Sequence, residues 1–280
     1  MQRRVLLSSA AAAALAAALT ACGKKEPAAS AAAASSAASG ELRPITIGVT
    51  AGTSEEVAEV VTKEAEKAGL KVTVKVFGVY QTPDAALASG EIDANSYQHE
   101  PFLQAYNANN KTDLVVAGKT YLAPLALYSK KIKSASEIKD GATIAIPNDP
   151  SNGGRALQLL AKQGWIELKP DVPATKVTKA DITKYVKKIK IVEIEAPQLP
   201  RSLDDTTASV INAGYAFAAN LTKKDQIVAE DNTSPYVNII AVKKGRETDP
   251  SIVKYIEIFH TEPVKKFIED KYKGQVVPAW

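Results

Sequence analysis

The side chains that most often perform catalysis are few in this chain and lie far apart in the sequence. It contains two histidines, His99 and His260, and a single cysteine, Cys22. The HExxH pattern of zinc hydrolases, the GxSxG turn of serine hydrolases and the GxxxxGKS/T loop that binds nucleotide phosphates are all missing from the sequence. We therefore expect no metal site and no cofactor.

Two pairs of acidic residues remain as candidates for acid–base catalysis. Asp204 is adjacent to Asp205, and Glu193 is two residues from Glu195. Two carboxyl groups can act as acid and base when their surroundings separate their pKa values. Adjacent or alternating acids are more often solvated surface groups, so the sequence favours a binding protein over an enzyme.

The first 21 residues are typical of an export signal. Arg3 and Arg4 precede an apolar run from Val5 to Leu19, which is shorter than the roughly 20 residues of a membrane-spanning helix. Leu19-Thr20-Ala21-Cys22 then resembles a bacterial lipobox, in which a peptidase cuts before the cysteine and the thiol carries diacylglycerol. We expect residues 1–21 to be a lipoprotein signal peptide and Cys22 to be lipidated. An ordinary signal peptide followed by an unrelated cysteine is the alternative.

Residues 22–43 form the next segment, and alanine and serine dominate it. Such a composition buries little apolar surface and predicts a flexible tether between the lipid and the folded part. Across the whole chain, 35 Lys and Arg residues nearly balance 31 Asp and Glu residues. This balance gives no electrostatic reason to expect nucleic-acid binding.

The folded part is predicted to begin with a strand, a helix and a second strand. Residues 45–50 are rich in β-branched side chains and predict a strand. Thr53 and Glu56 have the spacing of a capping box, which predicts the start of a helix that ends at Gly69. Residues 71–77 alternate polar and apolar side chains and predict a strand. A strand, a helix and a strand in this order indicate a parallel sheet.

Helices and strands continue to alternate along the rest of the chain. Further helices are predicted at residues 82–90, 101–109, 151–163, 251–259 and 263–272, and further strands at 114–117, 125–128, 142–147, 189–194, 208–211 and 237–242. This alternation is typical of α/β proteins. Two α/β lobes joined by crossing strands would satisfy the whole pattern.

Five segments are more specific than a general α/β pattern. They are Ala94–Leu103, Tyr128–Ser134, Ile146–Arg155, Glu195–Asp205 and Ser234–Asn238. In this order and spacing they closely resemble the methionine-binding lipoproteins of ABC transporters. The resemblance extends from about Ile45 to Trp280.

The resemblance implies a two-lobed periplasmic-binding-protein fold, type II-like, with the ligand in the cleft between the lobes. Residues 44–122 and 237–280 are expected to form lobe 1, and residues 123–236 to form lobe 2. It further implies a protein of the cell envelope that is anchored to a membrane by lipid and faces the periplasm. Its expected partners are methionine and the permease and ATPase subunits of an ABC transporter.

The same resemblance assigns the polar end of the ligand to three residues. A free amino acid carries both a carboxylate and an ammonium group, and burying both requires a partner for each. Arg155, near the start of a predicted helix, is expected to hold the carboxylate with its planar fork. Asn212 and Asn238 match family positions that bind the polar end, where amides donate and accept. A surface role for Arg155 and a turn-forming role for Asn212 are the alternatives.

The apolar end of the ligand is expected to meet aromatic residues. Tyr80, Tyr97 and Phe102 match the aromatic wall of the family, and aromatic edges suit a thioether sulfur. His99 lies among them in the sequence, and we expect it to line the pocket and form hydrogen bonds.

Two further functions stay open at this stage. Ser96-Tyr97 and residues 78–82 depart from the usual family residues, so the chain could instead bind another small amino acid or an organic anion. An anchored adhesion protein is the third hypothesis, and it predicts an exposed apolar or charged recognition stripe that the sequence does not show.

Overall fold

The structure is a computed structural model that describes residues 41–231 and 234–280. The predicted signal peptide, the predicted lipidation site Cys22 and nearly all of the predicted tether lie outside these residues. Within the described part of the chain, every helix is too short or too polar to cross a membrane. The elements described below therefore belong to the part predicted to fold.

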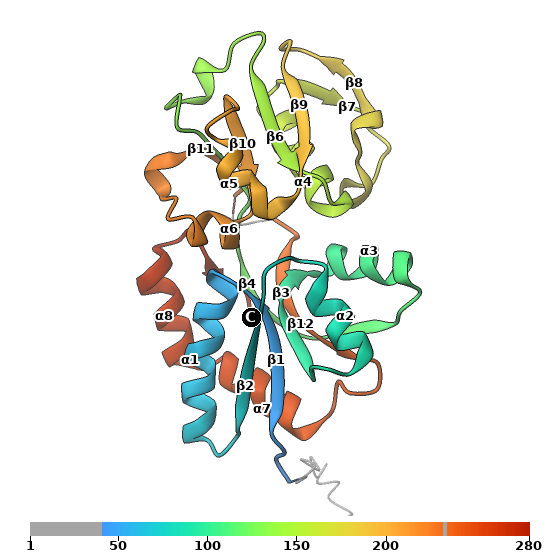
Figure 1. The fold of residues 1–280 in the computed structure, drawn as a ribbon, viewed down its shortest axis with the longest axis vertical. Coiled ribbons are helices and arrows are strands. Elements are labelled where there is room, and N and C mark those ends of the chain that lie inside the picture. The colour runs from blue at the N-terminus through green and yellow to red at the C-terminus, as the bar shows by residue number, and fades with distance from the viewer. Residues whose placement is uncertain (1–40, 232–233) are drawn as a thin grey trace, which may run out of the picture. The chain divides into compact units, whose positions relative to one another are not determined.

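Six strands form the first sheet, which is mixed in direction (Figure 1). Strands β1, β2 and β3 are parallel, whereas β12 runs antiparallel to both β3 and β4. In spatial order the strands are β13 (Val277–Pro278), β4 (Leu114–Leu122), β12 (Val237–Lys243), β3 (Ala94–His99), β1 (Ile45–Thr50) and β2 (Val72–Phe77). A strand from the end of the chain thus lies in the middle of a sheet that the first 80 residues begin.

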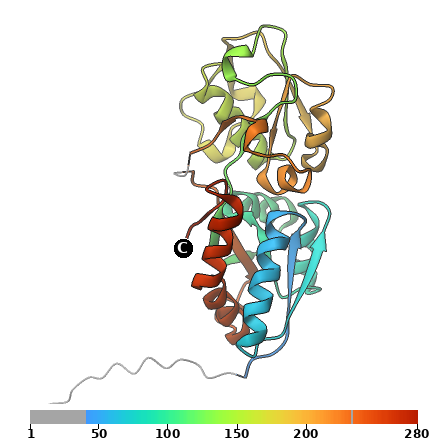
Figure 2. The same ribbon diagram turned by 90° about the vertical axis from the view of Figure 1, so that its left-hand side faces the viewer.

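Helices cover both faces of this sheet. One face packs on α1 (Thr53–Lys67), α7 (Pro250–Phe259) and α8 (Glu262–Tyr272), and the other on α2 (Thr82–Ser89) and α3 (Glu100–Asn110). Strand β12 shows the alternation that this requires, because Ile240 and Val242 join the first core and Ile239 and Ala241 the second. Figure 2 shows α1 and α8 side by side. We call this sheet with its five helices the first lobe.

The second sheet has five strands and its own helices. Its order is β11 (Gln226–Ala229), β5 (Ala126–Tyr128), β10 (Ala208–Ile211), β6 (Thr143–Pro147) and β9 (Lys190–Ile194). Helix α4 (Pro150–Lys162) packs on one face, and α5 (Leu199–Ser202) and α6 (Ala213–Ala218) pack on the other. The short antiparallel pair β7 (Ile166–Leu168) and β8 (Ile182–Tyr185) follows α4. We call this assembly the second lobe.

Two segments of the chain connect the sheets. The first, residues 123–125, leads from β4 to β5, and the second, residues 230–236, leads from β11 back to β12. Strand β1 ends at Thr50, β3 at His99 and β6 at Pro147, and Thr50 and His99 line the pocket described below. Ligands of α/β sheets commonly bind at the carboxyl ends of parallel strands.

One prediction about local structure was wrong, and one strand was missed. Thr53 does not cap helix α1: the cap position is Gly52, and it forms no side-chain hydrogen bond to the helix. The Thr53 side chain instead lines the pocket. Strand β3 was not predicted, because its sequence Ala-Asn-Ser-Tyr-Gln-His is mostly polar, yet all six residues are buried.

Candidate ligand-binding site

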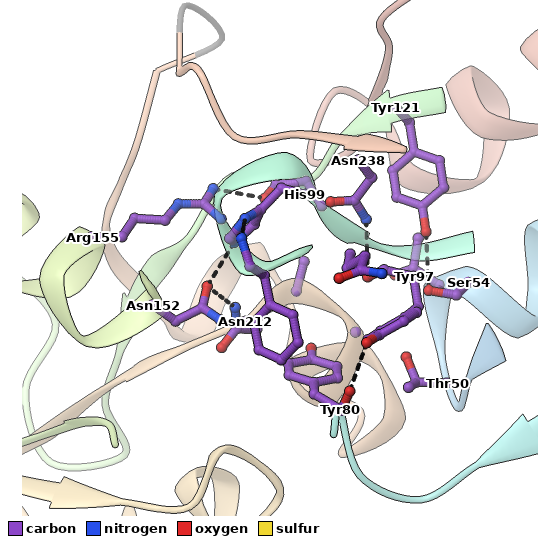
Figure 3. Close-up of a pocket in the computed structure, with 16 residues that line it drawn as sticks. Thr50, Ser54, Tyr80, Tyr97, His99, Tyr121, Asn152, Arg155, Asn212 and Asn238 are labelled. Atoms are coloured by element: carbon purple, nitrogen blue, oxygen red, sulfur yellow. Dashed lines mark hydrogen bonds between the residues drawn. The ribbon is translucent and has the colours of Figure 1, made fainter. Parts of the chain in front are cut away.

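A pocket lies between side chains of the two lobes (Figure 3). All seven residues that were expected to bind ligand line it, namely Tyr80, Tyr97, His99, Phe102, Arg155, Asn212 and Asn238. Residues up to 158 positions apart in the sequence therefore share one cavity.

His99 is positioned by the junction between β3 and α3. It caps α3, and its Nδ1 accepts a hydrogen bond of 3.2 Å from the backbone nitrogen of Phe102. Pro101 follows in the first turn of the helix, where a missing N–H costs no hydrogen bond. The imidazole is thus fixed by the same contact that begins the helix.

The hydrogen bonds of His99 also define its protonation state. Burial first, and the positive charge of Arg155 second, lower the pKa of His99 to about 3. The ring is therefore neutral at pH 7, and because Nδ1 accepts, Nε2 carries the proton. Nε2 lies 3.1 Å from Oδ1 of Asn152 and donates to it.

Asn152 connects the two sides of the pocket. Its Nδ2 is held by the carboxylate of Asp149, the cap of α4, at 3.1 Å to each oxygen. Its Oδ1 accepts from His99 of the first lobe and, at 2.9 Å, from Nδ2 of Asn212. The amide of Asn212 is oriented by this donation.

Two buried amide oxygens of the pocket have no hydrogen-bond partner among the described residues. They are Oδ1 of Asn212 and Oε1 of Gln98. Both residues line the pocket and are at most 9% exposed. A buried acceptor without a donor is unfavourable, and a ligand that carries N–H groups would supply the donors.

Arg155 reaches the pocket from α4 and is 3% exposed. Its Nε donates at 2.8 Å to Oε1 of Glu230, and its Nη2 donates to Oε2 of the same carboxylate. Nη2 also donates at 3.1 Å to the carbonyl oxygen of Ala123, and the guanidinium lies 4.5 Å from the ring centre of Tyr236. The arginine is therefore bound to both segments that connect the lobes.

The planar fork of Arg155, which we expected to hold a ligand carboxylate, already has a partner in the protein. Its Nε–Nη2 edge is occupied by Glu230. No sequence pattern pointed to Glu230, which lies 75 residues from Arg155.

The aromatic residues form one connected group. The ring centres of Tyr80 and Tyr97 are 5.9 Å apart, and each lies 6.1 Å from that of Phe102 at a steep angle. Tyr80 also contacts Tyr215 of the second lobe at 4.5 Å. The hydroxyl of Tyr97 donates at 2.7 Å to the carbonyl oxygen of Tyr80. These contacts make an apolar wall with fixed ring orientations.

Asn238 lies on β12 directly beside His99 on β3. Its Nδ2 is 3.4 Å from the carbonyl oxygen of Tyr97, a long hydrogen bond. The side chain is half-buried and borders the pocket.

Several lining residues were not predicted individually. Gln98 and Asn152 lie inside the segments that carry the family resemblance, so their polar side chains were a usable signal. Thr50, Thr53, Ser54, Tyr121, Ala123, Ala213 and Gly214 complete the lining. Within residues 41–231 and 234–280, no cluster of His, Cys, Asp and Glu could hold a metal ion.

Two α/β lobes connected by two crossing segments, with a buried polar and aromatic pocket between them, define a periplasmic substrate-binding protein. Comparison with known proteins gives the family: the model of the NlpA lipoproteins matches residues 45–280. The chain therefore belongs to the NlpA lipoprotein family.

Individual relatives agree with this assignment. A probable D-methionine-binding lipoprotein MetQ of Vibrio cholerae is 44% identical over 238 residues, which is 84% of this chain and 88% of the relative. A nutrient-binding protein from Burkholderia cenocepacia, solved bound to methionine, is 45% identical with a TM-score of 0.81 and covers 84% of this chain and 100% of its own. An ABC transporter periplasmic substrate-binding protein from Coxiella burnetii is 38% identical with a TM-score of 0.81 and the same coverage of both chains.

Proposed function

We propose that this protein is the methionine-binding component of an ABC importer, which captures methionine in the cell envelope and delivers it to a permease driven by an ATPase. The observation that carries the proposal is the chemistry of the pocket. It combines a fixed arginine, two unpaired buried acceptors and an aromatic wall. These features are complementary to the carboxylate, the ammonium and the thioether of one small molecule.

The polar end of methionine fits the junction of the two lobes. We assign its carboxylate to the Nη1 side of Arg155, with Asn238 as a further donor. The ammonium then donates to the unpaired oxygens of Asn212 and Gln98. Charge-assisted hydrogen bonds of this kind each contribute about 1.5–3 kcal/mol. Both opposite charges of the ligand would therefore be paired after burial.

The thioether is assigned to the wall of Tyr80, Tyr97 and Phe102. Contacts between sulfur and aromatic edges contribute about 0.3–1.5 kcal/mol each, in addition to about 0.8 kcal/mol for each buried methylene. The neutral His99 borders this region. Because it carries no charge, an apolar ligand side chain can pack beside it without removing water from a charged group. The pocket should therefore prefer an unbranched sulfur-containing side chain.

Calorimetry with a set of amino acids tests the ligand. We expect the order methionine, then norleucine, then glutamine, measured for both enantiomers of methionine. Mass spectrometry of ligand released from protein purified without unfolding provides an independent test. If glutamine or a dicarboxylate binds as tightly as methionine, the alternative of another amino acid or organic anion replaces this proposal.

The membrane anchor is a separate part of the proposal. The segment Leu19-Thr20-Ala21-Cys22 supports lipidation of Cys22, and a diacylglyceryl group provides the two acyl chains that stable anchoring requires. We expect Cys22→Ser to abolish labelling by a radioactive fatty acid and to release the protein from membranes. Label retained by this variant would contradict the anchor.

Delivery to a transporter requires partners and moving lobes. We propose residues 44–122 with 237–280 and residues 123–236 as the two rigid units, because the crossings lie at 123–125 and 230–236. A permease and its ATPase, reconstituted with the lipidated protein, should import labelled methionine only when the binding protein is present. Import that is independent of this protein would contradict the assigned partners.

A further inference from the structure

A cluster of buried polar side chains lies behind the pocket wall, with Asp84 of α2 at its centre. Asp84 is completely buried. Its Oδ1 accepts hydrogen bonds from Nδ2 of Asn95 at 2.9 Å and from Nε2 of Gln98 at 2.5 Å. Its Oδ2 lies 3.0 Å from the hydroxyl oxygen of Tyr97. The two carboxyl oxygens therefore have different surroundings.

The hydroxyl of Tyr97 has more neighbours than its single hydrogen can serve. It lies 2.7 Å from the carbonyl oxygen of Tyr80 as well as 3.0 Å from Oδ2 of Asp84. A carbonyl oxygen can only accept, so the tyrosine hydrogen is used on Tyr80, the nearer of the two. The contact between Tyr97 and Oδ2 then requires a hydrogen from Asp84.

The neighbouring amides do not supply that hydrogen. Nε2 of Gln98 donates to Oδ1 of Asp84 and, at 3.0 Å, to Oδ1 of Asn95. Rotating this amide by half a turn would place its oxygen against both of these acceptors. The orientation of Gln98 is therefore fixed, and Tyr97 is the hydrogen-bond partner of Oδ2 among the described residues.

We propose that Asp84 is a neutral carboxylic acid in the folded protein at mildly acidic pH, and that it then donates from Oδ2 to the hydroxyl of Tyr97 and thereby holds that hydroxyl on the carbonyl of Tyr80. Tyr97, Gln98 and Tyr80 all line the ligand pocket. Asp84 itself does not line the pocket and acts through these residues, so it is a positioning residue. The predicted effect of Asp84 on methionine binding rests on the proposed function, whereas the proposed protonation of Asp84 is independent of that function.

The surroundings of Asp84 favour its protonated form at mildly acidic pH. Burial raises the pKa of Asp84 to about 6, against the opposing effect of its contacts with Asn95, Gln98 and Tyr97. The titratable groups that face it are phenols, those of Tyr97 on β3 and Tyr106 on α3. Strand β1 has no titratable side chain, and Lys243 at the end of β12 is exposed and donates to the carbonyl of Ala88.

Loss of this proton should loosen the pocket wall. An ionised Asp84 would compete with the Tyr80 carbonyl for the single hydrogen of Tyr97. Methionine affinity should therefore fall as the pH rises through about 6, by about three- to tenfold between pH 5 and pH 8. His99 does not titrate in this range, because its pKa lies at about 3.

Infrared difference spectroscopy of the ligand-free protein tests the protonation directly. The wild type should show the carbonyl band of a protonated carboxylic acid at about pH 5, and this band should disappear toward about pH 8. It should be missing from Asp84→Asn throughout. If the difference between wild type and variant shows only carboxylate bands across this range, Asp84 is ionised and the proposal fails, whether or not methionine is the ligand.

Calorimetry across the same pH range tests the positioning role. Asp84→Asn keeps an acceptor for Asn95 and Gln98 and a donor for Tyr97, so its methionine affinity should not depend on pH. Asp84→Ala should bind about tenfold more weakly at every pH, since it removes one hydrogen-bond partner from Tyr97 and one from Gln98. The control Asp113→Asn changes an exposed carboxylate outside the pocket and should keep the wild-type profile. If the methionine affinity of Asp84→Asn depends on pH as steeply as that of the wild type, Asp84 is not the positioning residue.

Discussion

Arg155 and Glu230 form an ion pair through two parallel hydrogen bonds, although they come from α4 and from the segment that follows β11. The same guanidinium donates to the carbonyl of Ala123 in the other crossing segment. One side chain is thus bound to both connections between the lobes. These contacts hold Arg155 in its position in the pocket before a ligand binds. Binding then requires little further ordering of this side chain, so the entropy lost on binding is smaller.

The first prediction concerns the removal of this guanidinium. Arg155→Ala should weaken methionine binding by about 2–5 kcal/mol, because the ligand carboxylate would be buried without a partner. Arg155→Lys should restore only part of this loss, since a lysine ammonium cannot bind Glu230 in parallel and still face the ligand. Isothermal calorimetry measures both affinities.

A ligand without a carboxylate provides the control for Arg155. The amine 3-(methylthio)propylamine should bind the wild type weakly, and Arg155→Ala should weaken its binding only a little further. Comparing both ligands on both proteins forms a thermodynamic cycle that isolates the interaction between Arg155 and the ligand carboxylate. An equal loss for methionine and for this amine would mean that Arg155 supports the connecting segments rather than the ligand.

The second prediction separates binding from stability at two asparagines. Asn212→Ala removes the unpaired oxygen assigned to the ligand ammonium and should cost about 1.5–3 kcal/mol of binding. Asn107, away from the pocket, bonds to Thr112 and to both backbone groups of Leu114. Asn107→Ala should lower the melting temperature and leave the affinity unchanged. Thermal melts and calorimetry on both variants test this contrast, and an affinity unaffected by Asn212→Ala would remove that residue from the site.

The third prediction is a dependence of stability on pH through His99. Its pKa is about 3 in the folded protein and about 6.5 in an unfolded chain, so the unfolded state binds the extra proton first as the pH falls. The stabilisation is fully present above about pH 6.5 and is lost progressively toward pH 3, by about 2 kcal/mol at pH 5. Urea unfolding of wild type and His99→Gln at about pH 7.5 and 5 measures it. If the free energy of unfolding changes equally with pH in both proteins, His99 is not the source of the pH dependence.

The fourth prediction concerns a close backbone approach between the lobes, at Gly52 and Gly214. A Cβ atom on Gly52 would lie 2.4 Å from the carbonyl oxygen of Gly214, which lines the pocket on the second lobe. Gly52→Ala should therefore hold the lobes apart and weaken methionine binding by at least about tenfold, as expected when a closed arrangement is needed for binding. Small-angle scattering with and without methionine should show less closure than in the wild type.

Gly69→Ala is the matched control for that variant. Both glycines have a positive φ, 91° for Gly52 and 78° for Gly69, but nothing lies within 4 Å of a Cβ on Gly69. Both variants should lose stability because of the backbone strain. Only Gly52→Ala should lose affinity, and a similar loss in Gly69→Ala would assign the effect to strain alone.

Much of the fold could be predicted because local patterns and packing agree. The β-branched segment from Ile45 to Thr50 is a strand over that whole range, and it is followed by α1 and a parallel β2 as expected. Gly90 ends α2 in a left-handed conformation, as its position predicted. Strand β3 could not be predicted in this way, because its polar side chains are buried by partners from α2 and β12 that are far away in the sequence.

The site residues also divide into those that could be predicted from the sequence and those that could not. Resemblance to a family placed seven residues that do share one pocket, although their contacts with a ligand remain proposals. Glu230 could not be found from the sequence, because an acidic residue in a loop has no local feature that identifies its distant arginine. Thr53 was misread because its spacing to Glu56 fits a helix cap, while the pocket uses its side chain instead.

The ion pair of Arg155 and Glu230 has a consequence for the response of the protein to ionic strength. Its two charges already compensate each other, and a zwitterionic ligand adds none, so binding changes the net charge of neither the pocket nor the solution. Dissolved salt weakens attraction between separated charges over a distance of about 8–10 Å, but here no long-range attraction draws the ligand in. The protein should therefore retain its cargo equally well in dilute and in concentrated salt.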